Sequence, residues 1–134
     1  MYFQDLSPYT YMNNEPNPDL LSVGWLDAEH DFCKGRVSDE DLEKILALCF
    51  RPVNATRGIH SSPFIPRNPY GYPVEYHGNK MGLGSAEIRV QGENGRSYAA
   101  PNLIYHYIKD CGYLPPEEFL VALHSMKMNS TRHP

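Results

Sequence analysis

A chain of 134 residues with 41% hydrophobic and 21% charged residues has the size and composition of one globular domain with a single core. Its formal net charge of -4 argues against a protein whose main task is to neutralise the phosphates of a nucleic acid. No apolar run approaches the roughly twenty residues that span a bilayer, and the first residues lack the basic and apolar regions of a signal peptide. We therefore expect a cytoplasmic protein that binds neither nucleic acid nor membrane.

Residues 1–19 are rich in Tyr, Pro and Asn and show no helical period. Their aromatic side chains are too numerous for a free tail, so we expect an arm that packs on the domain. Residues 21–26 then read as a short strand with Trp25 as its anchor, followed by a polar connection over residues 27–37. At the other end of the chain, residues 127–134 are polar and predict a frayed tail.

The clearest helix begins at Ser38. Ser38 and Asp41 resemble a capping box with Asp in place of Glu, which satisfies free N–H groups of the first turn. Apolar residues then recur at helical spacing on one face, namely Leu42, Ile45, Leu46 and Cys49. Pro52 ends the pattern, because proline disfavours a helical conformation in the residue before it.

Residues 52–83 contain five prolines and four glycines, which exclude a long helix. A short extended piece around residues 74–76 is compatible with this composition. Irregular stretches of this length are uncommon inside a compact domain and are usually functional. We therefore expect a long ordered loop.

A β-hairpin is predicted around Asn94-Gly95, because a type I′ turn needs positive φ at both central residues and these two residue types tolerate it. The two predicted strands are residues 84–91 and 96–100. On this register Glu93 and Arg96 flank the turn as a favourable cross-strand charge pair.

Two further helices follow the hairpin. The first is expected to open at Pro101 and to end at Gly112, where a left-handed residue commonly closes a helix. Its apolar stripe consists of Leu103, Ile104, Tyr107, Ile108 and Cys111. The second begins at Pro115-Pro116, with acidic residues near the positive end of its dipole. The elements together predict a single α+β domain with a small antiparallel sheet, a β-hairpin, about three helices and long ordered loops.

Three cysteines, Cys33, Cys49 and Cys111, are too few for a complete disulfide framework and show no C-x-x-C spacing. Cys49 and Cys111 fall on predicted apolar stripes, where a free cysteine behaves as a small hydrophobe. We expect reduced, buried thiols.

The long loop over residues 52–83 interleaves Arg with aromatic residues, and these residue types are enriched at protein interfaces. The residues that we expect to bind a partner protein are Arg57, His60, Phe64, Arg67, Tyr70, Tyr72 and Tyr76. Prolines in the same loop would hold such a surface in place and lower the ordering cost of association. The alternative is a covering loop whose tyrosines pack on the sheet.

Four short motifs of the sequence together form a recognisable pattern. They are Asp-Leu-Ser-Pro-Tyr at residues 5–9, Arg-Gly-Ile-His at 57–60, Ala-Ala-Pro-Asn-Leu-Ile at 99–104 and Gly-Tyr-Leu-Pro-Pro-Glu-Glu-Phe at 112–119. With these blocks the chain resembles a family of small uncharacterised bacterial proteins, and the resemblance implies a shared fold. Many of these relatives carry Arg-Gly-x-His-x-Cys-x-x-Cys, which looks like a zinc knuckle. In this chain Ser62 and Ile65 stand at the two thiol positions.

Two thiolates with one or two imidazoles suit a tetrahedral zinc ion, whereas His60 and His106 alone make a poor site. His106 lies off the apolar stripe of its helix. We expect no metal and no cofactor in this chain. The alternative is a degenerate zinc knuckle that recognises nucleic acid or protein.

Catalytic patterns are weak in this sequence. Asp27, His30 and Asp31 form a local cluster that is typical of a solvated turn, and the sequence contains no nucleophile elbow or phosphate-binding loop. A Ser/His/Asp trio can be assembled in several ways, so none is favoured. We therefore expect a non-catalytic protein-binding module, in its sharpest form an immunity or antitoxin-type inhibitor of a bacterial toxin. A small enzyme that uses His60 or His106 as its base is a further alternative.

Overall fold

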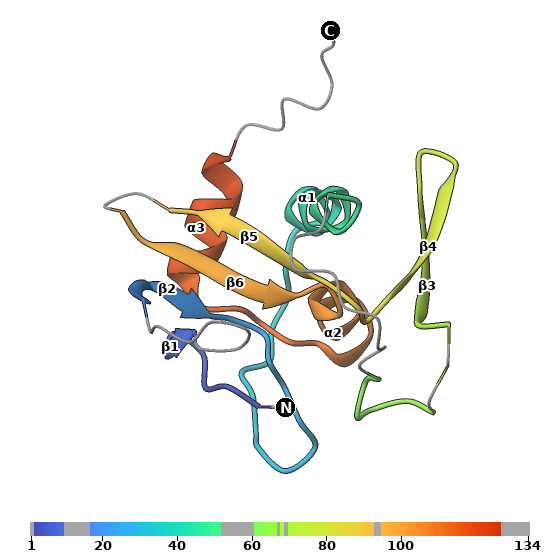
Figure 1. The fold of residues 1–134 in the computed structure, drawn as a ribbon, viewed down its shortest axis with the longest axis horizontal. Coiled ribbons are helices and arrows are strands. Elements are labelled where there is room, and N and C mark those ends of the chain that lie inside the picture. Colours follow the sequence, from blue (N-terminus) through green and yellow to red (C-terminus); the bar gives the residue numbers. More distant parts are fainter. Residues whose placement is uncertain are drawn as a thin grey trace, which may run out of the picture.

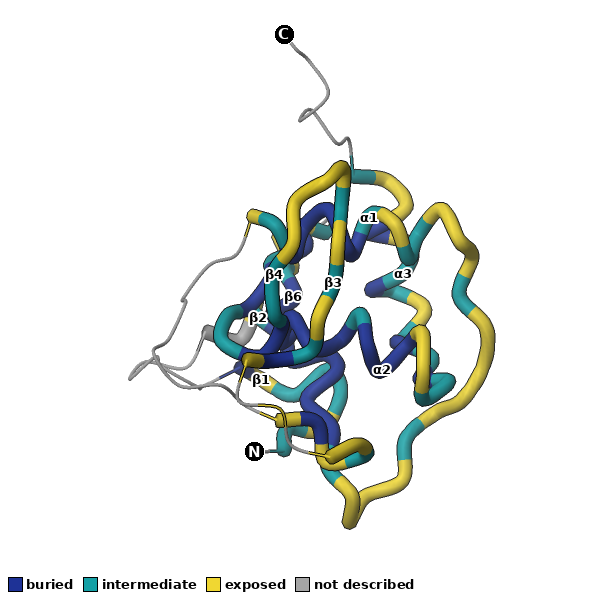
Figure 2. The backbone as a smooth tube through the Cα atoms, turned by 90° about the vertical axis from the view of Figure 1, so that its right-hand side faces the viewer, coloured by how far each residue is buried: buried dark blue, intermediate teal, exposed yellow. Residues whose placement is uncertain are grey.

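The computed structural model describes residues 2–9, 17–51, 61–66, 68, 70–92 and 95–126. The strands are β1 (Pro8–Tyr9), β2 (Asn17–Ser22), β3 (Tyr72–Tyr76), β4 (Asn79–Leu83), β5 (Glu87–Gln91) and β6 (Ser97–Pro101). The helices are α1 (Asp39–Cys49), α2 (Ile104–Cys111) and α3 (Glu117–Ser125). Strands β1, β2, β6 and β5 lie in this order in one sheet, and α1, α2 and α3 lie on one of its faces (Figure 1, Figure 2). The predicted single α+β domain is confirmed.

The four-stranded sheet is mixed. β5 and β6 pair antiparallel, with Glu87 opposite Pro101, as the predicted hairpin requires. β2 pairs parallel with β6, with Leu20 opposite Ser97, where the sequence indicated antiparallel pairing. Parallel neighbours need a long connection, and here α1 and the strands β3, β4 and β5 come between them in the chain.

The turn of the β5–β6 hairpin keeps part of its expected chemistry. Gly95 has a φ of 78°, and Gly92 N donates to Arg96 O at 2.8 Å. Glu93, the expected partner of Arg96, lies outside the described residues. Arg96 forms an ion pair with Glu118 at 3.1 Å, which links the hairpin to α3.

β2 lies earlier in the chain than predicted and ends at Ser22. The reason is Gly24, which has a φ of 79° and whose N–H donates to Asp5 Oδ1 at 3.0 Å rather than to a neighbouring strand. Trp25 is the anchor that the sequence predicted, because it is buried and its Nε1 donates to Ala99 O at 3.0 Å.

The described part of the N-terminal arm, residues 2–9, packs on the domain. Phe3 N donates to Trp25 O at 3.2 Å, and Tyr9 is 1% exposed. The rings of Phe3, Tyr9 and Trp25 contact one another. Phe3 and Tyr9 of the arm therefore form a small second core with Trp25.

Capping explains where α1 begins and where α2 ends. Ser38 Oγ accepts from Asp41 N at 3.2 Å, which confirms the predicted start of α1. α2 begins at Ile104, and the prediction that Pro101 opens it is wrong, because Pro101 is the last residue of β6. Gly112 ends α2 with a φ of 75°, as predicted.

The main core lies between the sheet and the helices. α3 begins directly after Pro116, as predicted, and buries Phe119 and Leu123. Ile45 of α1 and Ile104 of α2 are also fully buried. In the described part of the chain, no helix is both long and apolar enough to cross a membrane.

All three cysteines are free. Cys49 is buried, as expected, and Cys111 is half-buried. Cys33 is exposed, so the expectation of buried thiols is wrong for this residue.

β3 and β4 form a second hairpin, of which the sequence predicted only a short extended piece. The two-residue turn His77-Gly78 joins them, with φ values of 50° and 83°. Such a turn makes Tyr76 and Asn79 a hydrogen-bonded pair, so the backbone nitrogen of Pro73 faces away from β4 and needs no partner there. Figure 1 shows this hairpin standing apart from the four-stranded sheet.

Candidate functional site

One face of the β3–β4 hairpin packs on the domain. Along β3, Tyr72, Val74 and Tyr76 are half-buried, whereas the residues between them are exposed. Val74 packs against the main core, and the Tyr76 ring lies 5.7 Å from the Phe50 ring. β4 ends at Leu83, which is fully buried. The inner side of the hairpin is therefore fixed, and its outer side faces solvent.

Tyr72 is turned inward. Its ring centroid lies 4.5 Å from that of His106, and its hydroxyl donates to Asp110 Oδ2 at 2.5 Å. Burial, and then the neighbouring Asp110, raise the pKa of Tyr72. The hydroxyl therefore keeps its proton and remains a donor.

His106 is fully buried, although the sequence places it off the apolar stripe of α2. Ser62 and Tyr72 cover this face of the helix. His106 Nε2 lies 2.8 Å from Ser62 Oγ, and its Nδ1 lies 2.9 Å from Asp110 Oδ2. We call Ser62, Tyr72, His106 and Asp110 the polar network.

The Asp110 carboxylate fixes the direction of these hydrogen bonds. Burial opposes the ionisation of Asp110, but the hydrogen bonds from Tyr72 and His106 outweigh it and lower the pKa of Asp110. A carboxylate only accepts, so His106 Nδ1 carries a proton, and in the neutral ring Nε2 accepts from the Ser62 hydroxyl. The polar network thus joins the segment of Ser62 to α2 and to β3.

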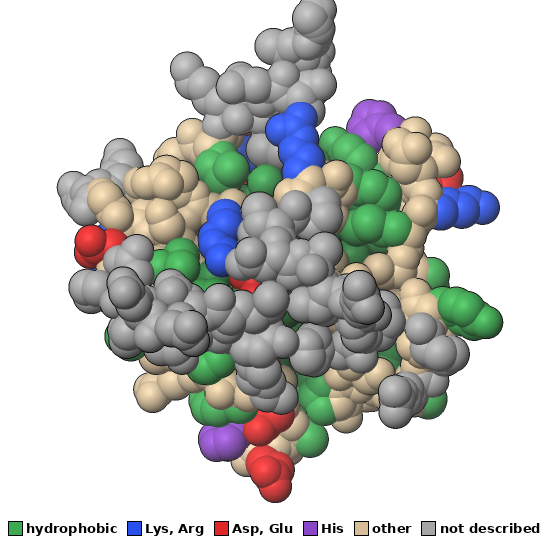
Figure 3. Space-filling view, in the orientation of Figure 1, with side chains coloured by type: hydrophobic (Ala, Val, Ile, Leu, Met, Phe, Trp, Pro, Cys, Tyr) green, Lys and Arg blue, Asp and Glu red, His purple; other side chains and the backbone are tan. Residues whose placement is uncertain are grey.

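The residues expected to bind a partner are divided between the inside and the outside of the domain. Phe64 is turned inward, with its ring 5.7 Å from those of Phe32 and Tyr107. Tyr70 is 84% exposed. Arg57, His60 and Arg67 lie outside the described residues. In the space-filling view, hydrophobic side chains gather on the side of the molecule where the β3–β4 hairpin lies (Figure 3).

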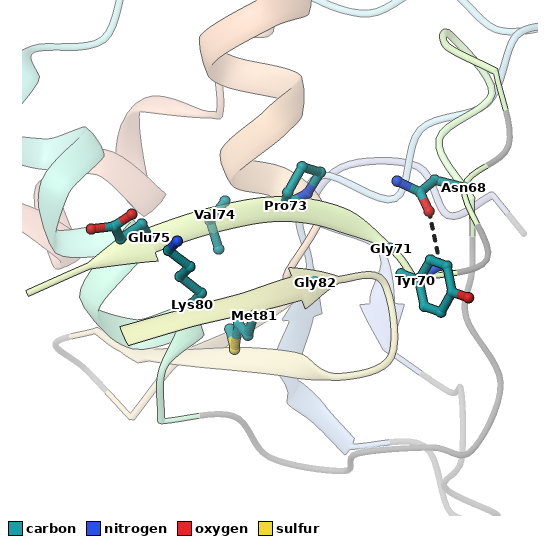
Figure 4. Close-up of a pocket in the computed structure, with 9 residues that line it drawn as sticks. All are labelled: Asn68, Tyr70, Gly71, Pro73, Val74, Glu75, Lys80, Met81 and Gly82. Carbon is teal, nitrogen blue, oxygen red and sulfur yellow. Dashed lines mark hydrogen bonds between the residues drawn. The ribbon is translucent and has the colours of Figure 1, made fainter. Parts of the chain in front are cut away.

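Tyr70 borders a depression of about 500 Å³ on the hairpin. Its lining is Asn68, Tyr70, Gly71, Pro73, Val74, Glu75, Lys80, Met81 and Gly82 (Figure 4). Gly82 is required, since a Cβ at this position would lie 1.8 Å from Tyr70 O. Asn68 Oδ1 accepts from Tyr70 N at 2.9 Å, so the backbone beneath the exposed ring is held from two sides. Tyr70 stands at one end of the depression and Glu75 at the other (Figure 4).

The zinc-knuckle positions carry other contacts in this chain. Among the described residues, no group of three or more His, Cys, Asp or Glu could hold a metal ion. Ser62, at the first thiol position, hydrogen-bonds His106, and Ile65, at the second, is 39% exposed.

Asp27 and His30 form a surface turn. Asp27 Oδ1 accepts from His30 N at 3.0 Å and lies 2.7 Å from His30 Nδ1. The side-chain hydrogen bond from His30 lowers the pKa of Asp27. The Tyr2 ring stacks on His30, with the ring centroids 3.8 Å apart. Asp27 and His30 therefore bind each other on the surface.

The fold and the site define a small α+β domain that carries a separate β-hairpin with an exposed tyrosine beside it. The chain belongs to the family described as Domain of unknown function (DUF7919), which matches residues 1–124. No curated protein and no solved structure matches the chain. The expected membership in an uncharacterised family is thus confirmed, and the description of the family names neither a zinc knuckle nor an activity.

Proposed function

We propose that this chain is a protein-binding module that inhibits a partner protein, in the manner of an immunity protein or antitoxin. The observation that carries the proposal is Tyr70, which is 84% exposed on a backbone held by Asn68 and packed on Gly82. An exposed tyrosine on a fixed backbone offers a large contact area at a low cost in conformational entropy.

The packing beneath Tyr70 supports this function. Tyr72 attaches the inner face of the hairpin to α2, and Tyr76 packs on Phe50 at the end of α1. A partner that docks on the outer side meets a surface that is already ordered. The ordering penalty of association is therefore small.

Charge favours a protein partner over a nucleic acid. The formal net charge of -4 opposes the approach of a phosphate backbone. Glu75 and Lys80 lie opposite each other on β3 and β4, and both line the depression. One acid and one base on the same surface can orient a protein that presents the complementary pair.

The product of the adjacent gene is the partner to test first, with isothermal titration calorimetry of the purified proteins. Tyr70→Ala is expected to weaken binding by about tenfold or more, because truncating a tyrosine that is an interface hot spot costs about 2 kcal/mol or more and about 1.4 kcal/mol already corresponds to tenfold. Tyr72 is unsuitable for this test, since its loss also removes the hydrogen bond to Asp110.

Val121→Ala is the matched control. Val121 is 55% exposed on α3 and does not line the depression beside Tyr70. We expect the Val121→Ala variant to bind like the wild type. If Tyr70→Ala also binds like the wild type, the hairpin surface is not the contact surface.

A further inference from the structure

Ser62, His106 and Asp110 stand in the order of a nucleophile, a base and an orienting acid. His106 Nε2 lies 2.8 Å from Ser62 Oγ, and His106 Nδ1 lies 2.9 Å from Asp110 Oδ2. Both distances fall in the range of the hydrogen bonds that activate a serine. Serine acyl-transfer enzymes on unrelated folds share this arrangement, which is recognised by geometry and not by sequence order.

The surrounding contacts hold the three groups in place. Asp110 follows His106 by one turn of α2, so the helix itself fixes their separation. Tyr72 donates to the same Oδ2 of Asp110, and Phe64 N donates to Ser62 Oγ at 3.1 Å. His106 is fully buried, so water does not compete for its ring nitrogens. In the neutral ring, with its proton on Nδ1, Nε2 accepts the Ser62 hydroxyl proton.

A cavity of about 110 Å³ adjoins Ser62, and Asn68, Gly71 and Tyr72 are among the residues that line it. One water takes up about 30 Å³, so the cavity holds a group of about three or four non-hydrogen atoms, the size of an acetyl group. Asn68 Oδ1 is occupied by Tyr70 N. The amide NH₂ of Asn68 is therefore the part that can donate to a substrate oxygen.

We propose that Ser62 is a nucleophile that takes acetyl-sized acyl groups from carboxylic esters, with His106 as its base and Asp110 as the residue that positions His106. This activity goes beyond partner binding, which depends on Tyr70.

In the acylation step, Ser62 Oγ bonds to the carbonyl carbon while its proton passes to His106 Nε2. The bond between that carbon and the alcohol oxygen then breaks, and the departing oxygen takes the proton from Nε2. The product is an acyl ester on Ser62. A water molecule then attacks the same carbon and passes a proton to His106 Nε2. The bond between that carbon and Ser62 Oγ breaks, Oγ takes the proton from Nε2, and the carboxylic acid is released. The ester and water are therefore the only reactants.

p-Nitrophenyl acetate is the probe, used with the full chain. We expect the acetyl group on Ser62 in peptide mass spectrometry, and an initial burst of about one equivalent of nitrophenolate per chain. Ser62→Ala removes the burst. Ser125→Ala, which changes an exposed serine at the end of α3, retains it.

Asp110→Asn tests the positioning role. It should lower the rate of acylation of Ser62 by about 100-fold or more, because the imidazole loses the carboxylate that sets its tautomer. Thermal unfolding followed by circular dichroism checks that this variant is folded. An acylation rate equal to that of the wild type would remove Asp110 from the proposal.

Two results would overturn the role of Ser62. One is an acetyl group found only on lysines or on Ser61, and the other is a burst that survives Ser62→Ala. If Ser62→Ala does not fold, the residue that carries the acetyl group in the wild-type chain still shows whether Ser62 is the nucleophile. Partner binding is tested separately through Tyr70, so either proposal can fail alone.

Discussion

The Tyr72 hydroxyl donates a 2.5 Å hydrogen bond to Asp110, a residue 38 positions further along the chain. This bond attaches the β3–β4 hairpin to α2. The same carboxylate oxygen also lies 2.9 Å from His106 Nδ1. One oxygen atom therefore contacts both His106 of α2 and Tyr72 of β3, the strand that follows the exposed Tyr70.

Tyr72→Phe keeps the ring against His106 and removes only the hydroxyl. We expect the free energy of unfolding, measured in urea, to fall by about 1 kcal/mol, because the Asp110 side chain is 41% exposed and water replaces part of the lost bond. Tyr70→Phe is the control and should change the free energy by less than about 0.5 kcal/mol. A Tyr72→Phe variant as stable as the wild type would show that this bond makes no net contribution.

The burial of Asp5 leads us to expect that the free energy of unfolding depends on pH. Burial raises the pKa of Asp5 above its ordinary value of 3.8, although hydrogen bonds from Gly24 N and the Tyr113 hydroxyl act in the opposite direction. The folded chain therefore holds this proton more tightly than the unfolded chain. The stabilisation is complete below pH 3.8 and is lost as the pH rises through the raised pKa of the folded state.

The measurement is the free energy of unfolding of the wild type and of Asp5→Asn from below pH 3.8 to neutral pH. The variant carries no titrating group at this position, so its stability relative to the wild type should increase across that window. Asp31→Asn, at an exposed residue, is the control. A constant difference between Asp5→Asn and the wild type would contradict the prediction.

Gly82→Ala tests the close approach of the Gly82 backbone to Tyr70 in the depression on the hairpin. The added Cβ would lie 1.8 Å from Tyr70 O, so one of the two backbone segments must move. We expect the free energy of unfolding to fall by about 3 kcal/mol, at the upper end for overpacking. Gly78→Ala is the control, because its Cβ meets nothing within 4 Å and it costs only about 1 kcal/mol for its left-handed backbone. Equal losses of the free energy of unfolding in Gly82→Ala and Gly78→Ala would contradict the close approach of Gly82 to Tyr70 O.

The cysteines should react with a thiol reagent in a fixed order. Cys33 is exposed and should react first in the folded chain at neutral pH. Burial raises the pKa of Cys49 to about 12, so Cys49 should react only after unfolding. Burial, and then Asp110, raise the pKa of the half-buried Cys111, which should react at an intermediate rate. Timed quenching and peptide mapping give the order, and simultaneous reaction of Cys33 and Cys49 would contradict it.

Elements whose signals are local could be predicted from the sequence. Ser38 caps α1, Gly112 ends α2, and Pro116 precedes α3, since in each case a residue type acts on its own turn of the helix. The β5–β6 hairpin depends on a turn between adjacent strands and is local for the same reason.

Features that depend on distant segments could not be predicted. The burial of His106 requires Ser62 and Tyr72, which come from other parts of the chain, so the helical pattern of α2 does not reveal it. The β3–β4 hairpin was missed because Pro73 interrupts the pattern. The alternation of Tyr72, Val74 and Tyr76 before His77-Gly78 is the signal that would have found it, and with it Glu75, Lys80 and Gly82 of the depression beside Tyr70.

The parallel pairing of β2 with β6 has a consequence for how the domain is made. β2 and β6 are the two central strands of the sheet, and they pair only when Leu20 comes to lie opposite Ser97. More than half of the chain lies between these two residues. During synthesis β2 leaves the ribosome long before β6, so the four-stranded sheet can form only after most of the domain has emerged. Contacts between such distant segments are slow to form. Until β6 pairs with it, β2 has an unpaired edge to which strands of other chains can bind.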